Sequence, residues 1–155
     1  MGDFNKLGLK KQILLAIKHK ESTEVQEKII PLALQGKNIV FPSMTGSGKT
    51  LAYTLGFLGK INPKLGIQMI VLVPTRELAI QVKKEIEQIC EPLKIKVGML
   101  FGGRSIAGDY KTTKRRNQIL IGTPGRLIQH VNEKNIKIGD VKYLVFDESD
   151  QMFDR

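Results

Sequence analysis

The apolar residues near the amino terminus recur every three or four positions, which is the spacing of an amphipathic helix. The positions that show this spacing are Leu9, Ile13, Leu14 and Ile17. A second pattern of the same period, which includes Val25 and Ile29, starts just after Ser22 and Thr23. Either hydroxyl side chain can cap a helix, so we expect a helix to begin after one of them.

From residue 38 onward the pattern changes to short apolar runs that do not alternate with polar residues. These runs cover residues 38–42, 69–73, 97–101, 119–121 and 143–146. Between them lie helical patterns at residues 49–58 and 76–89, after Gly103 and after Pro124. Strands that are apolar on both sides and alternate with helices are typical of a buried parallel sheet. The pattern therefore predicts an α/β fold, with a mostly parallel sheet and helices on both faces.

The length of 155 residues suits one domain, and the sequence contains no internal repeat. No apolar run approaches the length of a membrane span, and the amino terminus does not resemble a signal peptide. The single cysteine, Cys90, excludes an internal disulfide framework and is expected to be a core residue. No Cys and His cluster indicates a zinc site. We therefore expect an intracellular protein without membrane partners, in the cytoplasm or, in a eukaryote, the nucleus.

The formal net charge of +10 is strongly basic and favours polyanionic partners, nucleic acid in particular. Scattered lysines on a solvated surface would give the same total without any specific partner. Part of the charge is concentrated between Lys111 and Arg116. That cluster has two equally good interpretations, a non-specific phosphate contact or an exposed helix end.

The most informative segment is the glycine-rich stretch from Ser43 to Thr50, which reads SMTGSGKT. It follows the apolar run at 38–42 and precedes a helical pattern, so a strand, a glycine loop and a helix are expected in that order. This setting cradles nucleotide phosphates, because glycines let backbone N–H groups turn toward them. The loop residues expected to do this are Thr45, Gly46, Ser47 and Gly48. Lys49 can reach the β- and γ-phosphates, and the Thr50 hydroxyl can bind Mg²⁺.

A second chemical motif, Asp147-Glu148-Ser149-Asp150, follows the apolar run that ends at Phe146. Alone, an acidic pair after a buried strand is usually a surface turn. Downstream of a phosphate-binding loop, it favours catalysis. Asp147 is then expected to reach the Mg²⁺, and Glu148 to orient or deprotonate the attacking water.

Two further motifs lie at expected strand-to-helix junctions, where open α/β sheets place ligands. Residues 74–79 read PTRELA and residues 123–126 read TPGR, with Gly102-Gly103 between them. In this order, the motifs from about Phe4 to Arg155 resemble the DEAD-box family of ATP-dependent RNA helicases in superfamily two. The acidic motif departs from the family pattern in one position, because Ser149 stands where the family has alanine.

The resemblance implies a RecA-like lobe that binds ATP and Mg²⁺. It also implies that Gln26 reads the adenine edge, in an upstream element that includes Thr23. A Gln amide suits this role because it donates and accepts at once. Phe4 resembles the isolated aromatic that precedes this element, so it either stacks on adenine or packs the terminus.

RNA is the second ligand that the resemblance implies. The expected backbone contacts come from Thr75, Arg76, Gly103, Thr123 and Arg126. For Arg76 the alternative is an intramolecular ion pair with Glu77 or a neighbour. Asp150 is expected to couple the acidic motif to the second lobe.

By the same resemblance, residues 1–155 form the amino-terminal ATP-binding lobe and stop soon after the acidic motif. In the family, a later strand with a Ser-Ala-Thr motif lies between the phosphate-loop strand and the acidic-motif strand. A second RecA-like lobe then supplies arginines to the γ-phosphate. Without that strand the sheet would carry an open apolar slot. A partner segment would fill the slot, the sheet would rearrange, or the lobe would be marginally stable.

The implied activity is ATP binding and hydrolysis coupled to RNA clamping and local duplex unwinding. Two alternatives stay open at this point. The first is a DNA helicase of the same superfamily. The second is a nucleotide- and RNA-binding module that is inactive on its own, because this chain alone provides only one wall of the cleft.

Overall fold

A computed structural model describes residues 1–154 of the chain. The strands are β1 (Met69–Leu72), β2 (Val97–Leu100), β3 (Ile119–Gly122) and β4 (Tyr143–Phe146). The α-helices are α1 (Lys11–Ala16), α2 (Glu24–Leu34), α3 (Lys49–Leu58), α4 (Arg76–Cys90), α5 (Tyr110–Lys114), α6 (Pro124–Asn132) and α7 (Ser149–Phe153). Three 3-10 helices complete the list, η1 (Phe4–Lys6), η2 (Glu91–Leu93) and η3 (Ile106–Asp109).

The four strands form one parallel sheet in the order β2-β3-β1-β4. The register aligns Leu72 of β1 with Gly122 of β3 and Phe146 of β4. The segments that follow β1 to β4 therefore all leave the sheet at the same edge. Since the motif residues 74–79, 102–103, 123–126 and 147–150 lie in those segments, the topology gathers them along one edge of the sheet.

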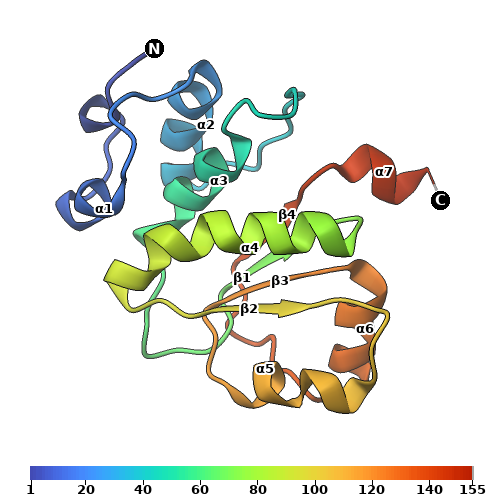
Figure 1. The fold of residues 1–155 in the computed structure, drawn as a ribbon. Coiled ribbons are helices and arrows are strands. Elements are labelled where there is room, and N and C mark those ends of the chain that lie inside the picture. Colours follow the sequence, from blue (N-terminus) through green and yellow to red (C-terminus); the bar gives the residue numbers. More distant parts are fainter. Residues whose placement is uncertain (155) are drawn as a thin grey trace.

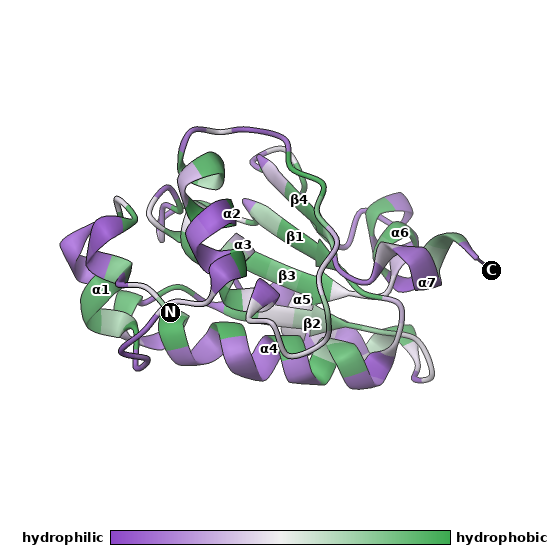
Figure 2. Ribbon diagram, turned by 90° about the horizontal axis from the view of Figure 1, so that it is seen from above, coloured by the Kyte–Doolittle hydropathy of each residue, from purple (hydrophilic) through white to green (hydrophobic). Residues whose placement is uncertain are grey.

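Helices cover both faces of the sheet, as the sequence pattern predicted. Figure 1 shows α4 across one face, with α5 and α6 on the opposite side. The larger core joins one face of the sheet to α1, α3 and α4, and contains Leu55, Val71 and Ile86. The smaller core on the other face includes Leu120 and Leu127. Figure 2 shows that the strands between these layers are coloured as hydrophobic along much of their length. The α/β prediction is confirmed.

The strand predicted at residues 38–42 does not form, and this prediction was wrong. The segment is irregular, and the Val40 side chain is fully exposed. A strand requires a neighbour to pair its backbone groups. β4 pairs with β1 on one side only, and no strand formed by residues 1–154 lies along its other side. The 38–42 run therefore resembles a strand in sequence but pairs with no strand of residues 1–154.

The free side of β4 is also where apolar side chains reach the surface. Leu144 is 54 % exposed and Phe146 is 47 % exposed, whereas the other three strands are largely buried. An edge strand of this kind offers unpaired N–H and C=O groups beside uncovered apolar surface. The sequence predicted an apolar slot between two strands, but because the strand at 38–42 does not form, the described residues show an uncovered edge strand instead.

The helix starts follow their capping residues. The Thr23 hydroxyl accepts from the Gln26 N–H and the Gln26 side chain accepts from the Thr23 N–H, which makes a capping box at the start of α2. The Thr75 hydroxyl accepts from the Leu78 N–H at the start of α4. The basic helix expected after Gly103 is instead divided into η3 and α5.

Cys90 is buried at the end of α4, and burial raises the pKa of its thiol to about 12, with a smaller contribution from the Glu87 carboxylate. It is a core residue, as predicted. Among the helices of residues 1–154, none combines the length and the apolar character needed to cross a bilayer.

Candidate functional site

The glycine loop ends where α3 begins, and its backbone has the form that an anion cradle requires. Gly46 has φ +80° and Gly48 has φ +82°, a region that L side chains rarely adopt. No side chain caps α3, so the N–H groups of its first turn are left for another partner. The Ser47 hydroxyl is buried without a hydrogen-bond partner among residues 1–154. A phosphate group would satisfy these donors.

Lys49 brings the glycine loop and the acidic motif together. Its Nζ lies 3.4 Å from Asp147 Oδ1 and 3.6 Å from Glu148 Oε1. The Lys49 side chain is only 17 % exposed, so its charge is largely shielded from water. Residues far apart in the sequence thus form one cluster of a cation and two carboxylates.

Tyr53, one turn after Lys49 on α3, holds the other oxygen of Asp147. Its hydroxyl donates to Asp147 Oδ2 over 3.1 Å, and both side chains are buried. Burial, together with the nearby negative charge of Asp147, raises the pKa of Tyr53 well above its usual value. The hydroxyl therefore stays protonated and continues to donate. Tyr53 was not predicted from the motifs, although its spacing from Lys49 places it on the same helix face.

Glu148 stands in a strained backbone conformation, with φ 53° and ψ 49°. A left-handed conformation costs a non-glycine residue on the order of 1–3 kcal/mol, and such residues cluster at functional sites. The strain occurs at the turn from β4 into α7, and it directs the Glu148 carboxylate toward Lys49.

The oxygen groups at this cluster fit a magnesium ion. Asp147 is buried and supplies a carboxylate, and Thr50 supplies a buried hydroxyl. Within residues 1–154, no group of three or more His, Cys, Asp or Glu side chains forms a complete metal cage. Mg²⁺ is typically held by one or two protein groups together with waters and substrate phosphates, so a sparse protein contribution is expected.

The upstream element contacts the glycine loop directly. The Thr23 hydroxyl donates to the Ser47 carbonyl over 2.9 Å, and Gln26 Nε2 donates to the Gly48 carbonyl over 3.1 Å. A Cβ at Gly48 would meet Gln26 Nε2 at 2.5 Å, so this close approach requires glycine. Gln26 is 3 % exposed, with its amide engaged by Thr23 and Gly48. In this conformation it supports the loop.

Phe4 lies in the larger core and is 4 % exposed. Of the two roles predicted for Phe4, this position matches packing of the amino terminus. Stacking on adenine remains a prediction, and it would require the ring to be uncovered.

The second set of motif residues lies along the same sheet edge, after β1, β2 and β3. Thr75 is half-buried and occupied as a helix cap, while Gly103 is exposed with φ +88°. Thr123 precedes α6 and its side chain makes no cap hydrogen bond. Arg76 is exposed and makes no ion pair with any carboxylate in residues 1–154, which differs from the intramolecular alternative.

Arg126 was predicted to contact RNA, but its side chain does not lie at the surface. It is buried, and its Nε donates to Asp109 Oδ2 over 2.6 Å. Its Nη2 donates to the carbonyls of Arg104 and Ser105, over 2.6 and 2.8 Å. Arg126 therefore ties α6 to the loop that follows Gly102-Gly103. Asp109 carries no sequence signal that would have identified it, because its partners are brought to it only by folding.

Asp150, predicted to couple the acidic motif to a second lobe, is exposed in the first turn of α7. A side chain at this position is free to contact another body. A shallow hollow is lined by Pro74, Pro124, Gln151 and Met152, so it lies between two of the motif segments and α7.

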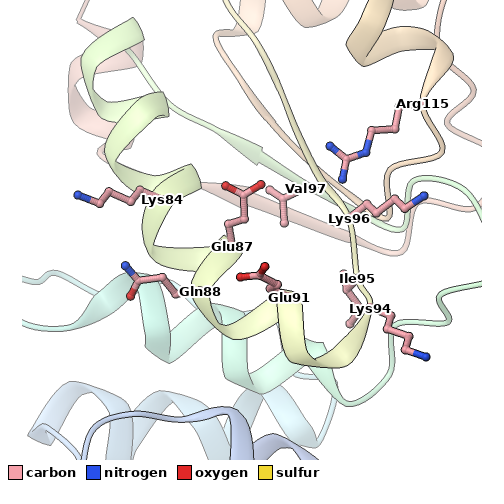
Figure 3. Close-up of a pocket in the computed structure, with 9 residues that line it drawn as sticks. All are labelled: Lys84, Glu87, Gln88, Glu91, Lys94, Ile95, Lys96, Val97 and Arg115. Atoms are coloured by element: carbon pink, nitrogen blue, oxygen red, sulfur yellow. The ribbon is translucent and has the colours of Figure 1, made fainter.

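A second pocket, larger than this hollow, lies away from all of these residues. Figure 3 shows it between the carboxyl-terminal half of α4, the segment entering β2, and Arg115. Its lining carries Lys84, Lys94 and Lys96 beside Glu87 and Glu91. No residue of the glycine loop or the acidic motif contributes to it, so we place the functional site at the opposite end of the strands.

A sequence profile of the DEAD/DEAH box helicase family matches residues 23–155. The chain belongs to this family. It is 41 % identical to the ATP-dependent RNA helicase CshA of Limosilactobacillus reuteri and covers 31 % of that protein, over 96 % of its own length. It is 42 % identical to a probable ATP-dependent RNA helicase of Methanocaldococcus jannaschii and covers 42 % of that protein, over 97 % of its own length.

Solved structures support the same assignment. A DEAD box protein from the hyperthermophile Methanococcus jannaschii superposes with a TM-score of 0.88 at 39 % identity, over 99 % of this chain and 43 % of that one. A Saccharomyces cerevisiae Dbp5 variant bound to Gle1 superposes with a TM-score of 0.89 at 30 % identity, over 100 % of this chain and 40 % of that one. The chain therefore corresponds to less than half the length of these relatives, and the sheet is the RecA-like fold of the family.

Proposed function

We propose that this chain is the ATP-binding lobe of an ATP-dependent RNA helicase, in which ATP binding and hydrolysis drive RNA clamping and local unwinding. The observation that carries the proposal is the cluster of Lys49 with Asp147 and Glu148 at the start of α3. It combines a phosphate cradle, a cation and two carboxylates at one point of the sheet edge.

In the proposed site, the glycine loop residues Thr45 to Gly48 and the first turn of α3 bind the phosphates. Lys49 leaves its carboxylate partners to contact the β- and γ-phosphates. Thr50 and Asp147 would hold Mg²⁺, which would neutralise part of the phosphate charge. Glu148 orients the attacking water, and Tyr53 keeps Asp147 in place through its hydroxyl.

RNA is proposed to bind at the same edge through Thr75, Arg76, Gly103 and Thr123, whose positions allow backbone contacts. Such contacts position a strand without reading its sequence. Because Arg126 is buried, its proposed part is to hold the loop after Gly103 in shape. A second lobe of the parent protein is the partner proposed for Asp150.

The rival function, a DNA helicase, is tested by comparing RNA and DNA strands of one sequence. We expect the protein to bind the RNA strand more tightly at every salt concentration, as 2′-hydroxyl contacts supplement the phosphate contacts. Fluorescence anisotropy with a labelled single strand measures both affinities. Equal affinities would favour the rival, and no binding of either strand would contradict the proposal.

The base preference tests Gln26. If Gln26 reads adenine, ADP should bind more tightly than GDP, and Gln26→Ala should narrow that difference. Because Gln26 also donates to the Gly48 carbonyl, Gln26→Ala is expected to weaken both nucleotides somewhat. Calorimetry with ADP and GDP separates the two effects. An equal loss for both nucleotides would assign Gln26 to loop support alone.

The remaining alternative is a nucleotide- and RNA-binding module without turnover. These relatives are more than twice as long as this chain, and by family resemblance a second lobe supplies the γ-phosphate arginines. Both ligands could then bind to this chain while hydrolysis required the longer protein. A turnover assay with and without the second lobe distinguishes these possibilities.

A further inference from the structure

Two arginines converge on one aromatic ring at the carboxyl edge of the sheet. The Arg76 Cζ lies 4.8 Å from the centroid of the Phe101 ring, and the Arg104 Cζ lies 4.6 Å from the same centroid. Phe101 directly follows β2 and is 5 % exposed, so the ring is a fixed platform. Stacking on an aromatic face orients a guanidinium group without consuming its hydrogen-bond donors.

A buried carboxylate anchors Arg104 from the other side. Arg104 Nη2 lies 2.7 Å from Asp109 Oδ1, and Asp109 Oδ2 accepts from Arg126 Nε and lies 2.8 Å from His130 Nε2. Burial by itself would raise the pKa of Asp109, but the hydrogen bonds from His130 and Arg126 outweigh it and lower the pKa. Asp109 therefore stays ionised at neutral pH and holds the loop in place.

The charges of this cluster do not balance. Two guanidinium groups, from Arg104 and Arg126, pair with one carboxylate, Asp109. A third, from Arg76, shares the Phe101 ring with Arg104 and pairs with no carboxylate of residues 1–154. Arg126 is buried, whereas the Arg104 side chain is 38 % exposed and Arg76 is exposed. The positive excess is thus presented to solvent by Arg76 and Arg104, beside the positive end of α4. An anion would relieve the repulsion between them.

We propose that Arg104 and Arg76, held together on Phe101, form a clamp for a phosphate group of single-stranded RNA. This inference rests on the proposed function and adds Arg104 to the RNA contacts. The planar guanidinium matches two phosphate oxygens at once, and Arg104 keeps free donors after its contact with Asp109. No sequence motif marks Arg104 as an RNA contact: it lies outside the basic run at Lys111–Arg116, and the adjacent glycine pair gives no information about its side chain.

Arg104→Gln is the most direct test, because glutamine removes the charge but keeps a polar side chain. A labelled single-stranded RNA is titrated by anisotropy at several salt concentrations. We expect about tenfold weaker binding at low salt, and a slope of log K against log salt that is smaller by about 0.7, the value for one lost single-strand phosphate contact. Arg76→Gln should give the same change in slope.

Two further variants separate the clamp from general effects of charge and folding. Lys84→Ala removes one exposed charge from α4, the helix that also carries Arg76, at the pocket shown in Figure 3. It should leave the slope of log K against log salt unchanged. Phe101→Leu keeps every charge but removes the platform, and should weaken RNA binding about threefold with little change in slope. Calorimetry with ADP should give the unaltered affinity for Arg104→Gln, which would show that the lobe is folded.

The outcomes are distinguishable. If Arg104→Gln retains full RNA affinity and slope while Arg76→Gln loses both, the clamp is wrong and the proposed function stands. If Lys84→Ala lowers the slope as much as Arg104→Gln, the effect is one of net charge and the clamp is again wrong. If the unaltered protein binds no RNA, the proposed function fails and the clamp fails with it.

Discussion

ATP hydrolysis by this chain alone is expected to be slower by about 10³–10⁵ than by a polypeptide that also carries the second lobe, which is the contribution of an arginine finger in related phosphoryl-transfer systems. Glu148 can orient water, and Lys49 can reach the phosphates. Lys49, however, is the only lysine or arginine of residues 1–154 that forms an ion pair with the acidic motif. Beside Lys49 and the proposed Mg²⁺, charge that develops on the γ-phosphoryl in the transition state therefore lacks a second cationic side chain.

Phosphate release with saturating RNA measures this difference. In the two-lobe polypeptide, Glu148→Gln should bind ATP normally and lose hydrolysis, since the amide keeps the shape of the side chain but cannot act as a base. Ser149→Ala, which restores the family residue next to it, is the matched control and should retain turnover. Robust hydrolysis by the single lobe would show that its own residues complete the site.

Lys49→Ala is expected to weaken Mg-ADP binding about 10- to 100-fold. The lost contact is a charge-assisted hydrogen bond in a shielded site, which contributes on the order of 1.5–3 kcal/mol. The variant also leaves Asp147 and Glu148 without their shared cation, so repulsion between the carboxylates and the phosphates adds to the loss. Calorimetry with Mg-ADP gives the affinities directly.

An exposed lysine outside the loop provides the control for this prediction. Lys37→Ala removes the same charge just after α2, where the side chain lies in solvent, and should bind Mg-ADP as the unaltered protein does. A thermal melt of both variants shows whether either is unfolded. Equal affinities for Lys49→Ala and Lys37→Ala would remove Lys49 from the phosphate site.

Local sequence patterns predicted the elements that depend on local interactions. A capping residue, Ser22 or Thr23, was predicted to start α2, and Thr23 does so, since a hydroxyl satisfies an N–H only one turn away. The apolar runs at 69–73 and 119–121 predicted buried strands, and both occupy the centre of the sheet. The run at 38–42 was also predicted as a strand and did not form one, because strand formation needs a neighbour that local sequence cannot supply.

The sequence by itself determined the class of this protein and singled out the residues proposed to bind phosphate, because the glycine loop, Lys49 and the acidic pair lie in short motifs. Tertiary structure decided which side chains are free to act. It buried Arg126 and Gln26 in contacts with neighbouring loops and left Arg76 exposed. It also brought Arg104 to Phe101 and Asp109. Exposure and ion pairing depend on what other segments cover, and only the packed sheet edge brings those segments together.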